Sequence, residues 1–141
     1  MIGAPFDGSG SAYLYEKPGS GWEDANQTAK LKPSDKVAGD QFGNSVAISG
    51  DTVVIGAHKD DYSQTSAIGS AYIYEKPGSG WVDSNQTAKF TASDKVAGDE
   101  FGFSVAISAD TVVIGARGGM IIPIKLILVL HIYLKNLVLL G

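Results

Sequence analysis

The sequence has no cysteine and only two histidines among its 141 residues, so several kinds of chemistry are excluded at once. Without cysteine there can be no disulfide bond, thiolate zinc site or cysteine nucleophile. Basic residues are also few: 11 Lys and Arg against 15 Asp and Glu give a net charge of −4, whereas a general nucleic-acid binder needs a basic surface. The chain contains no glycine-rich phosphate loop and nothing that resembles a Ser-His-Asp set. We therefore expect no catalytic residues and no enzyme.

The chain consists of two unlike segments. Residues 1–119 hold 17 of the 18 glycines and carry a net charge of −6. The remaining segment, Met120 to Gly141, has 16 apolar residues in 22, two lysines and no acid. High glycine content with dispersed apolar residues is typical of a turn-rich β protein, so the first segment is the informative one for the fold.

An internal repeat dominates the first segment. Residues 10–57 align with residues 69–116 at a constant offset of 59, and 39 of the 48 aligned positions are identical. Before Gly10 the offset changes, since Ile2-Gly3-Ala4 matches Ile55-Gly56-Ala57 at 53. The loop at residues 5–10 is therefore six residues shorter than the loop at residues 58–69.

Each repeat predicts four antiparallel strands. The expected strands are Ser45–Ser49, Thr52–Ala57, Ser70–Glu75 and a more polar outer strand within Trp81–Thr91. A Gly50-Asp51 turn joins the first two; because Ala109 replaces Gly50 in the next unit, we expect no glycine-only conformation there. The inner strands are apolar on both faces, which favours sheets stacked as propeller blades over a sheet with one wet face.

Spaced motifs within the repeat resemble the FG-GAP repeat of integrin α-subunits and bacterial surface proteins. The residues that carry the resemblance are Phe42, Gly43, Gly56, Ala57, Phe101, Gly102, Gly115 and Ala116. The resemblance covers residues 1 to about 117. It implies an all-β protein, a β-propeller usually of seven blades, located extracellularly or at the cell surface, with an adhesive or ligand-binding role.

The repeat boundaries predict an incomplete propeller. Residues 1–41 form a partial blade, residues 42–100 a complete blade, and residues 101–117 the start of the next. About two blades are too few to close a ring of four to eight. We therefore expect this chain to be a fragment of a longer repeat protein or a truncated gene product.

The apolar tail at residues 118–141 has three interpretations. It could be a C-terminal membrane anchor, although Lys125, His131 and Lys135 interrupt it. It could be a buried strand pair. The third interpretation is a one-base frame offset, because codons compatible with the tail allow DDNTNKANTGTAYIFEKPGTAW in the shifted frame, which restores the repeat. We favour the frame offset, so a membrane is expected as a partner only if the tail is genuine.

Calcium is the cofactor that the family resemblance raises, and the sequence does not match its loop. The D-x-[DN]-x-D-G pattern is absent, and Asp60 and Asp61 are adjacent rather than alternating, so they offer few ligands to one ion. We expect no metal and a solvated loop here. The other acids beside Gly and Lys, such as Asp40 and Glu100, are explained by solvation and turn hydrogen bonds.

The variable loop and the recurring aromatic residues complete the analysis. Aromatic residues that recur once per unit, Trp22 with Trp81 and the pairs Tyr13/Tyr15 and Tyr72/Tyr74, predict packing between blades rather than carbohydrate stacking. The long loop predicts a ligand site that includes His58, Lys59, Asp60, Asp61 and Tyr62. The expected function is a non-enzymatic scaffold for a protein or glycan ligand. The alternatives are a propeller-scaffold enzyme acting on polysaccharide and a surface protein with a C-terminal anchor.

Overall fold

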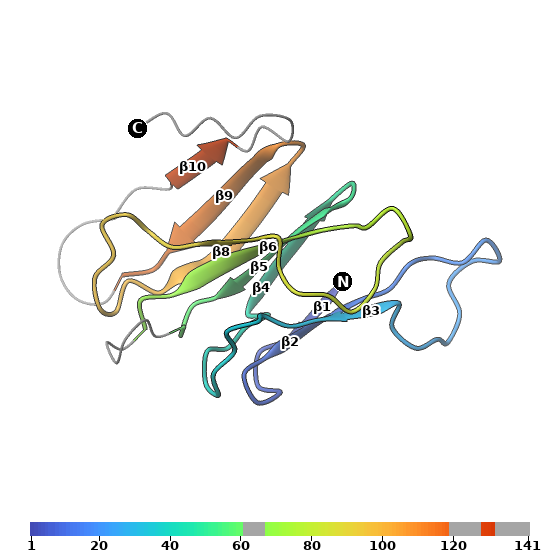
Figure 1. Ribbon diagram of the computed structural model, residues 1–141, viewed down its shortest axis with the longest axis horizontal. Coiled ribbons are helices and arrows are strands. Elements are labelled where there is room, and N and C mark those ends of the chain that lie inside the picture. The colour runs from blue at the N-terminus through green and yellow to red at the C-terminus, as the bar shows by residue number, and fades with distance from the viewer. Residues whose placement is uncertain (61–66, 119–127, 132–141) are drawn as a thin grey trace.

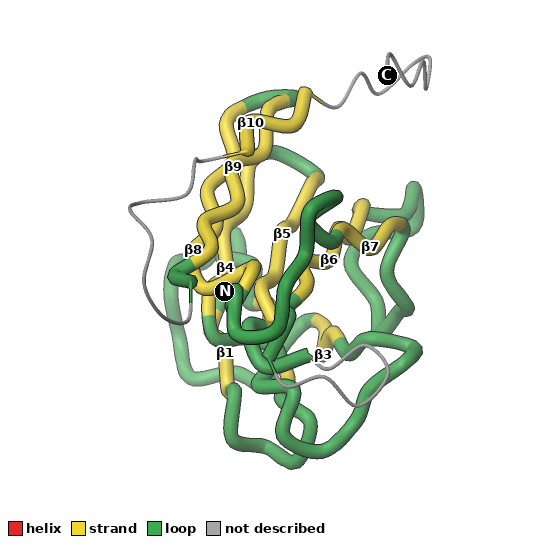
Figure 2. Tube along the Cα trace, turned by 90° about the vertical axis from the view of Figure 1, so that its left-hand side faces the viewer, coloured by secondary structure: helices red, strands yellow, loops and turns green. Residues whose placement is uncertain are grey.

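The computed structural model describes residues 1–60, 67–118 and 128–131, and its regular structure there consists entirely of β-strands, as Figure 2 shows. The strands are β1 (Ile2–Ala4), β2 (Ser11–Leu14), β3 (Ala29–Leu31), β4 (Ser45–Ser49), β5 (Thr52–Ala57), β6 (Ser70–Glu75), β7 (Ala88–Phe90), β8 (Phe101–Ser108), β9 (Thr111–Ala116) and β10 (Leu128–His131). The predicted all-β class is therefore confirmed.

The strands form three antiparallel sheets that follow the chain order. The first sheet is β1-β2-β3, the second β4-β5-β6-β7, and the third β10-β9-β8. The predicted inner strands β4, β5 and β6 have the expected bounds, and Ser49 pairs with Thr52 across the Gly50-Asp51 turn. All three sheets lie side by side in Figure 1, with the second sheet in the middle.

The predicted outer strand is shorter than its sequence range. Within Trp81–Thr91 only β7, Ala88–Phe90, pairs with β6. The polar residues before it bond across to the first sheet instead: Asp83 Oδ1 accepts the Lys30 backbone N–H at 2.7 Å, and Gln86 Oε1 accepts that of Ser34 at 3.0 Å. The Asp83 and Gln86 side chains therefore connect the second sheet to the first. A longer β7 would instead have extended only the second sheet.

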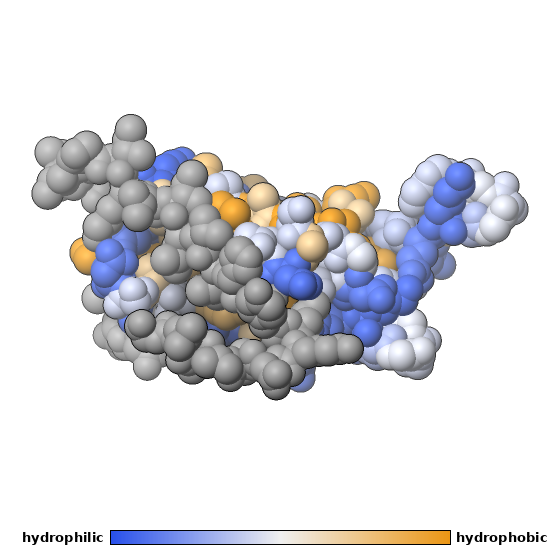
Figure 3. Space-filling model, turned by 90° about the horizontal axis from the view of Figure 1, so that it is seen from above, coloured by the Kyte–Doolittle hydropathy of each residue, from blue (hydrophilic) through white to orange (hydrophobic). Residues whose placement is uncertain are grey.

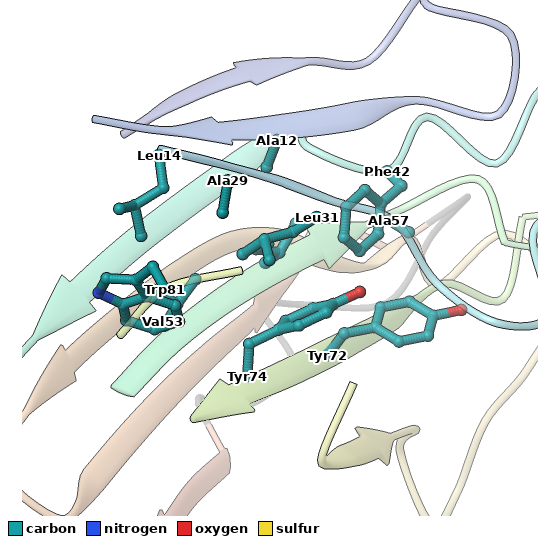
Figure 4. Packing of buried hydrophobic residues seen from close by; sticks show 11 residues of the cluster. Ala12, Leu14, Ala29, Leu31, Phe42, Val53, Ala57, Tyr72, Tyr74 and Trp81 are labelled. Carbon is teal, nitrogen blue, oxygen red and sulfur yellow. The ribbon is translucent and has the colours of Figure 1, made fainter. Parts of the chain in front are cut away.

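Apolar side chains cover both faces of the second sheet. On the face towards the first sheet, Val53, Ile55, Tyr72 and Tyr74 pack with residues such as Leu14 (Figure 4). On the opposite face, alternate residues of the same strands pack against the third sheet; these include Val54, Ala71 and Ile73, with Val112 and Ile114 from β9. Burial on both faces confirms the stacking that the apolar runs predicted.

Packing between sheets explains the recurring tryptophan only where a neighbouring sheet is present. Trp81 lies against Val53 and the first sheet and is 6% exposed (Figure 4). Its equivalent Trp22, in the polar loop between β2 and β3 that projects from the body in Figure 3, is 69% exposed. The predicted packing role therefore holds for Trp81 and is wrong for Trp22 within the described residues, where no further sheet covers the outer face of the first sheet.

The β4–β5 turn has a left-handed residue that need not be glycine. Gly50 has a φ of 54° and its equivalent Ala109, between β8 and β9, has a φ of 47°. Both turns therefore use the left-handed region, and because alanine also adopts it, the expectation that no glycine-only conformation is needed is confirmed. Alanine adopts this conformation at a cost of about 1 kcal/mol, since its Cβ approaches the following carbonyl.

The tail contributes one described strand. Strand β10 pairs antiparallel with β9, with Leu128 opposite Ile114 and His131 opposite Thr111. The rest of the tail lies outside the described residues, so the frame offset and the membrane anchor stay predictions. No helix in the described part of the chain has the length and apolar character needed to cross a membrane.

Candidate functional site

The recurring glycines mark places where backbones of two adjacent sheets touch. A Cβ built on Gly56 in β5 would lie 1.9 Å from the carbonyl oxygen of Gly102 in β8. Ser45 Oγ, from β4, donates to that same oxygen at 2.8 Å. In the same way, a Cβ on Gly3 would lie 1.9 Å from the Gly43 oxygen. The motif glycines thus allow one sheet to dock on the next at backbone contact distance.

The motif phenylalanines stabilise the same junctions through side-chain packing and a backbone hydrogen bond. Phe42 is fully buried and makes edge-to-face contacts with Tyr72 and Tyr74, at centroid distances of 5.4 and 6.1 Å. Its backbone N–H donates to Ser9 of the preceding loop at 3.0 Å, and Phe101 repeats that bond to Ile68 at 2.9 Å. Each phenylalanine therefore ties one sheet to the loop of the sheet before it.

A buried charge network lies at the base of the long loop. The Asp60 carboxylate accepts hydrogen bonds from Ser70 Oγ at 2.5 Å and Tyr72 OH at 3.2 Å, and Lys89 Nζ lies 2.7 Å from it. Lys89 also contacts Asp35 at 2.5 Å. Burial and the two nearby carboxylates raise the pKa of Tyr72 far above its ordinary value, so the hydroxyl stays a donor. Asp60 is 6% exposed, so the solvated loop expected for it is wrong.

The first sheet carries a copy of this network. Asp7 accepts from Ser11 Oγ at 2.8 Å, from Tyr13 OH at 3.2 Å and from Lys30 Nζ at 2.9 Å. The hydrogen bond from Lys30 leads the contacts that lower the pKa of Asp7 to about 2. The difference is exposure, because the Asp7 side chain is 47% exposed and that of Asp60 is 8% exposed.

Sequence reasoning missed this Asp–Ser–Tyr–Lys set, although the signal was present in the repeat. The serine, tyrosine and lysine recur at the offset of 59, and each aspartate stands three residues after the Gly-Ala of its unit. The aspartates recur at 53 because the loop insertion falls after them. Hydrogen-bond partners recurring together in register would have indicated a structural role for Asp60.

Asp40 occupies a second buried acidic position near this network. Its carboxylate accepts the Val37 backbone N–H at 2.6 Å, as the turn interpretation predicts, and Asp99 repeats the bond to Val96 at 2.7 Å. Asp40 is only 3% exposed, however, so solvation does not explain it. Burial, together with the charges of Asp60 and Asp35, raises the pKa of Asp40.

The first residues of the predicted ligand loop form an ion cluster with the third sheet. Lys59 pairs with Glu100, which also lies 2.8 Å from Arg117. Burial opposes the charge of Glu100, but the two cations hold its pKa below the ordinary value. Glu100 is 8% exposed, so the solvated position expected for it is also wrong. His58 is 5% exposed and packs edge-on to Phe103 at 5.4 Å.

The predicted ligand-loop residues therefore divide into two groups. His58 and Asp60 are buried, and Lys59 is held in an ion pair, so these three fix the loop base. Asp61 and Tyr62 lie outside the described residues. Among the described residues, no group of three or more His, Asp or Glu side chains is placed to hold a metal ion.

Lowering the pH is expected to destabilise the fold through His58. Burial lowers the pKa of His58, with the Lys59 and Arg117 charges acting in the same direction against the opposing charge of Glu100. The unfolded state therefore binds more protons below pH 6.5, and stability present above that pH is lost as the pH falls. We expect His58→Phe to flatten the dependence of the melting temperature between pH 7.5 and 5.5. An unchanged slope in this variant would contradict the assignment.

Comparison with known families gives a match over most of the repeat. A family model described as the FG-GAP repeat matches residues 25–74 and 84–120, which together make up more than half of the chain. The matched ranges contain Gly43, Gly56 and Gly102 and the two motif phenylalanines, Phe42 and Phe101, at the junctions of the sheets. No curated protein matches the sequence.

Proposed function

The chain belongs to the FG-GAP repeat family, whose repeats form β-propeller blades, and from that premise we propose a non-enzymatic scaffold that binds a protein or glycan ligand outside the cytoplasm. The ligand would be bound by the loop between β5 and β6. This location is supported by the way in which that loop differs from its counterpart between β1 and β2.

The two loops share one frame. In the short loop the Gly10 N–H donates to the backbone carbonyl oxygen of Asp7 at 2.9 Å. In the long loop the Gly69 N–H donates to the backbone carbonyl oxygen of Asp60, also at 2.9 Å. Ala67 has a φ of 55°, close to the 65° of its counterpart Gly8. Ile68 accepts the Phe101 N–H just as Ser9 accepts that of Phe42. The extra six residues are therefore 61–66, inserted between matched anchors.

This matched frame is the observation that carries the proposal. Because the short loop makes the same anchor contacts without these six residues, the insertion is not required to form the anchors and is free to serve recognition. The buried residues before the insertion, His58 and Asp60, are not expected to contact a ligand. Of the loop residues predicted from the sequence, Asp61 and Tyr62 are therefore the expected contact residues.

Deleting residues 61–66 is expected to abolish ligand binding without loss of the fold. The variant would carry Ala67→Gly, as in the short loop, so that the left-handed position is unstrained. The readout is binding of the full chain and the variant to a printed array of glycans and matrix proteins, together with thermal melting. We expect array signals from neutral glycans and matrix proteins to disappear while the melting temperature is retained. Identical array profiles, or an unfolded variant, would overturn the proposal.

A further inference from the structure

An open groove between the first and second sheets is distinct from the loop. It has a volume of about 540 Å³ and is lined by Lys30, Lys32, Pro33, Ser34, Lys36, Asp83, Ser84 and Asn85. Residues 30–36, in β3 and the segment after it, form one wall, and residues 83–85, in the polar segment before β7, form the other. Direct hydrogen bonds between these walls, from Lys30 to Asp83 and from Ser34 to Gln86, hold the groove in a fixed shape.

The charge of the groove is opposite to that of the chain. Three lysines and one aspartate line it, whereas the whole sequence has a net charge of −4. Lys30 is neutralised by Asp7, but Lys32 and Lys36 form no ion pair with any residue in the described ranges. The single acid, Asp83, accepts a backbone N–H through Oδ1 and keeps its negative charge. With Lys30 neutralised by Asp7, two ammonium groups without an ion pair and one carboxylate leave the groove with a net positive charge in an otherwise acidic protein.

The groove is also where the two repeat copies diverge. Only nine of 48 aligned positions differ, and three of them, Lys32, Pro33 and Ser84, line the groove. The residue equivalent to Lys32 in the second copy is Thr91, so the second copy lacks this lysine. The charge of Lys32 is thus a property of this one junction, whereas Lys36 recurs in the second copy as Lys95.

We propose that this groove binds an acidic polysaccharide, with Lys32 and Lys36 contacting its anionic groups. An open groove accommodates an extended chain, and the two ammonium groups attract sulfate or carboxylate groups. The Ser34 and Ser84 hydroxyls and the Asn85 amide provide the hydrogen bonds that sugar hydroxyls require. The site lies outside the β5–β6 loop and requires none of its residues.

The test compares charged and neutral polymers on the full chain. Dextran sulfate and polygalacturonate supply sulfate and carboxylate groups respectively, and unmodified dextran is the neutral control. We expect the full chain to bind at least one acidic polymer and not dextran, with affinity that falls as salt is added. Binding of only one acidic polymer identifies the anionic group, and no binding of either overturns the proposal.

Substitutions then locate the site. Lys32→Thr, which installs the residue of the second copy, is expected to weaken binding about threefold, and Lys32→Thr with Lys36→Gln about tenfold. Lys17→Gln removes an equal charge outside the groove and should leave binding unchanged. An equal loss in this control, or tighter lysine-dependent binding of single-stranded DNA, would overturn the assignment. Retained polymer binding after deletion of residues 61–66 would separate this site from the loop.

Discussion

Gly56→Ala is expected to destabilise the folded chain by about 3 kcal/mol, because the added methyl group has no room between two sheets. Its carbon would lie 1.9 Å from the Gly102 carbonyl oxygen, which is backbone and cannot rotate away. The second and third sheets would have to separate, which would open the cluster formed by Val54, Ile73 and Val112. Urea unfolding followed by far-ultraviolet circular dichroism measures the change.

The repeat supplies a matched control for this experiment. Gly115 stands at the equivalent position of β9, and a Cβ there would approach only the Ser104 hydroxyl within 3 Å among the described atoms. That hydroxyl can rotate, so Gly115→Ala is expected to change stability by less than about 1 kcal/mol. Equal effects of the two substitutions would show that contact between sheets is not the reason for the glycine.

The prediction from the sequence succeeded where local pattern decides the structure. The β-branched runs and the Gly50-Asp51 turn predicted the bounds of β4 and β5, because a short β-branched apolar run between turn residues has few other solutions. The apolar character of Val53 and Val54 on opposite faces likewise predicted a sheet covered on both sides. Both inferences need only residues within one repeat.

The prediction from the sequence failed where residues distant in the chain decide whether a side chain is exposed. Trp22 and Trp81 have the same local sequence, yet they are 69% and 6% exposed, because within the described part of the chain only Trp81 has a sheet to pack against. Asp60 fails for a related reason: it lies in a polar loop, which predicts solvent exposure, but its partners come from distant residues of its own sheet. Its burial depends on Ser70 and Lys89, which are ten and 29 residues further along the chain. Residue composition of the loop contains no information about these partners.

Asp60→Ala is expected to destabilise the chain by about 3 kcal/mol, since it removes the buried partner of the partly buried Lys89 ammonium and the acceptor of two hydroxyl groups. Lys89 Nζ would keep only Asp35, whose side chain is 42% exposed, and the Ser70 and Tyr72 hydroxyls would lose their acceptor. Asp7→Ala removes the equivalent carboxylate from the exposed copy. It is expected to shift the unfolding midpoint by less than the error of the measurement, because water can replace the lost contacts.

A double substitution tests whether the loss comes from the unpaired charge. Lys89→Met removes the ammonium but keeps most of the aliphatic side chain that packs on the Tyr72 ring, whose centroid lies 5.1 Å from Nζ. If the stranded cation causes the damage, Asp60→Ala combined with Lys89→Met should be more stable than Asp60→Ala alone, giving a coupling energy of at least about 1 kcal/mol. Additive losses would instead mean that Asp60 acts through the two hydroxyl hydrogen bonds. The long loop would then be anchored by neutral hydrogen bonding, and its base should be insensitive to salt.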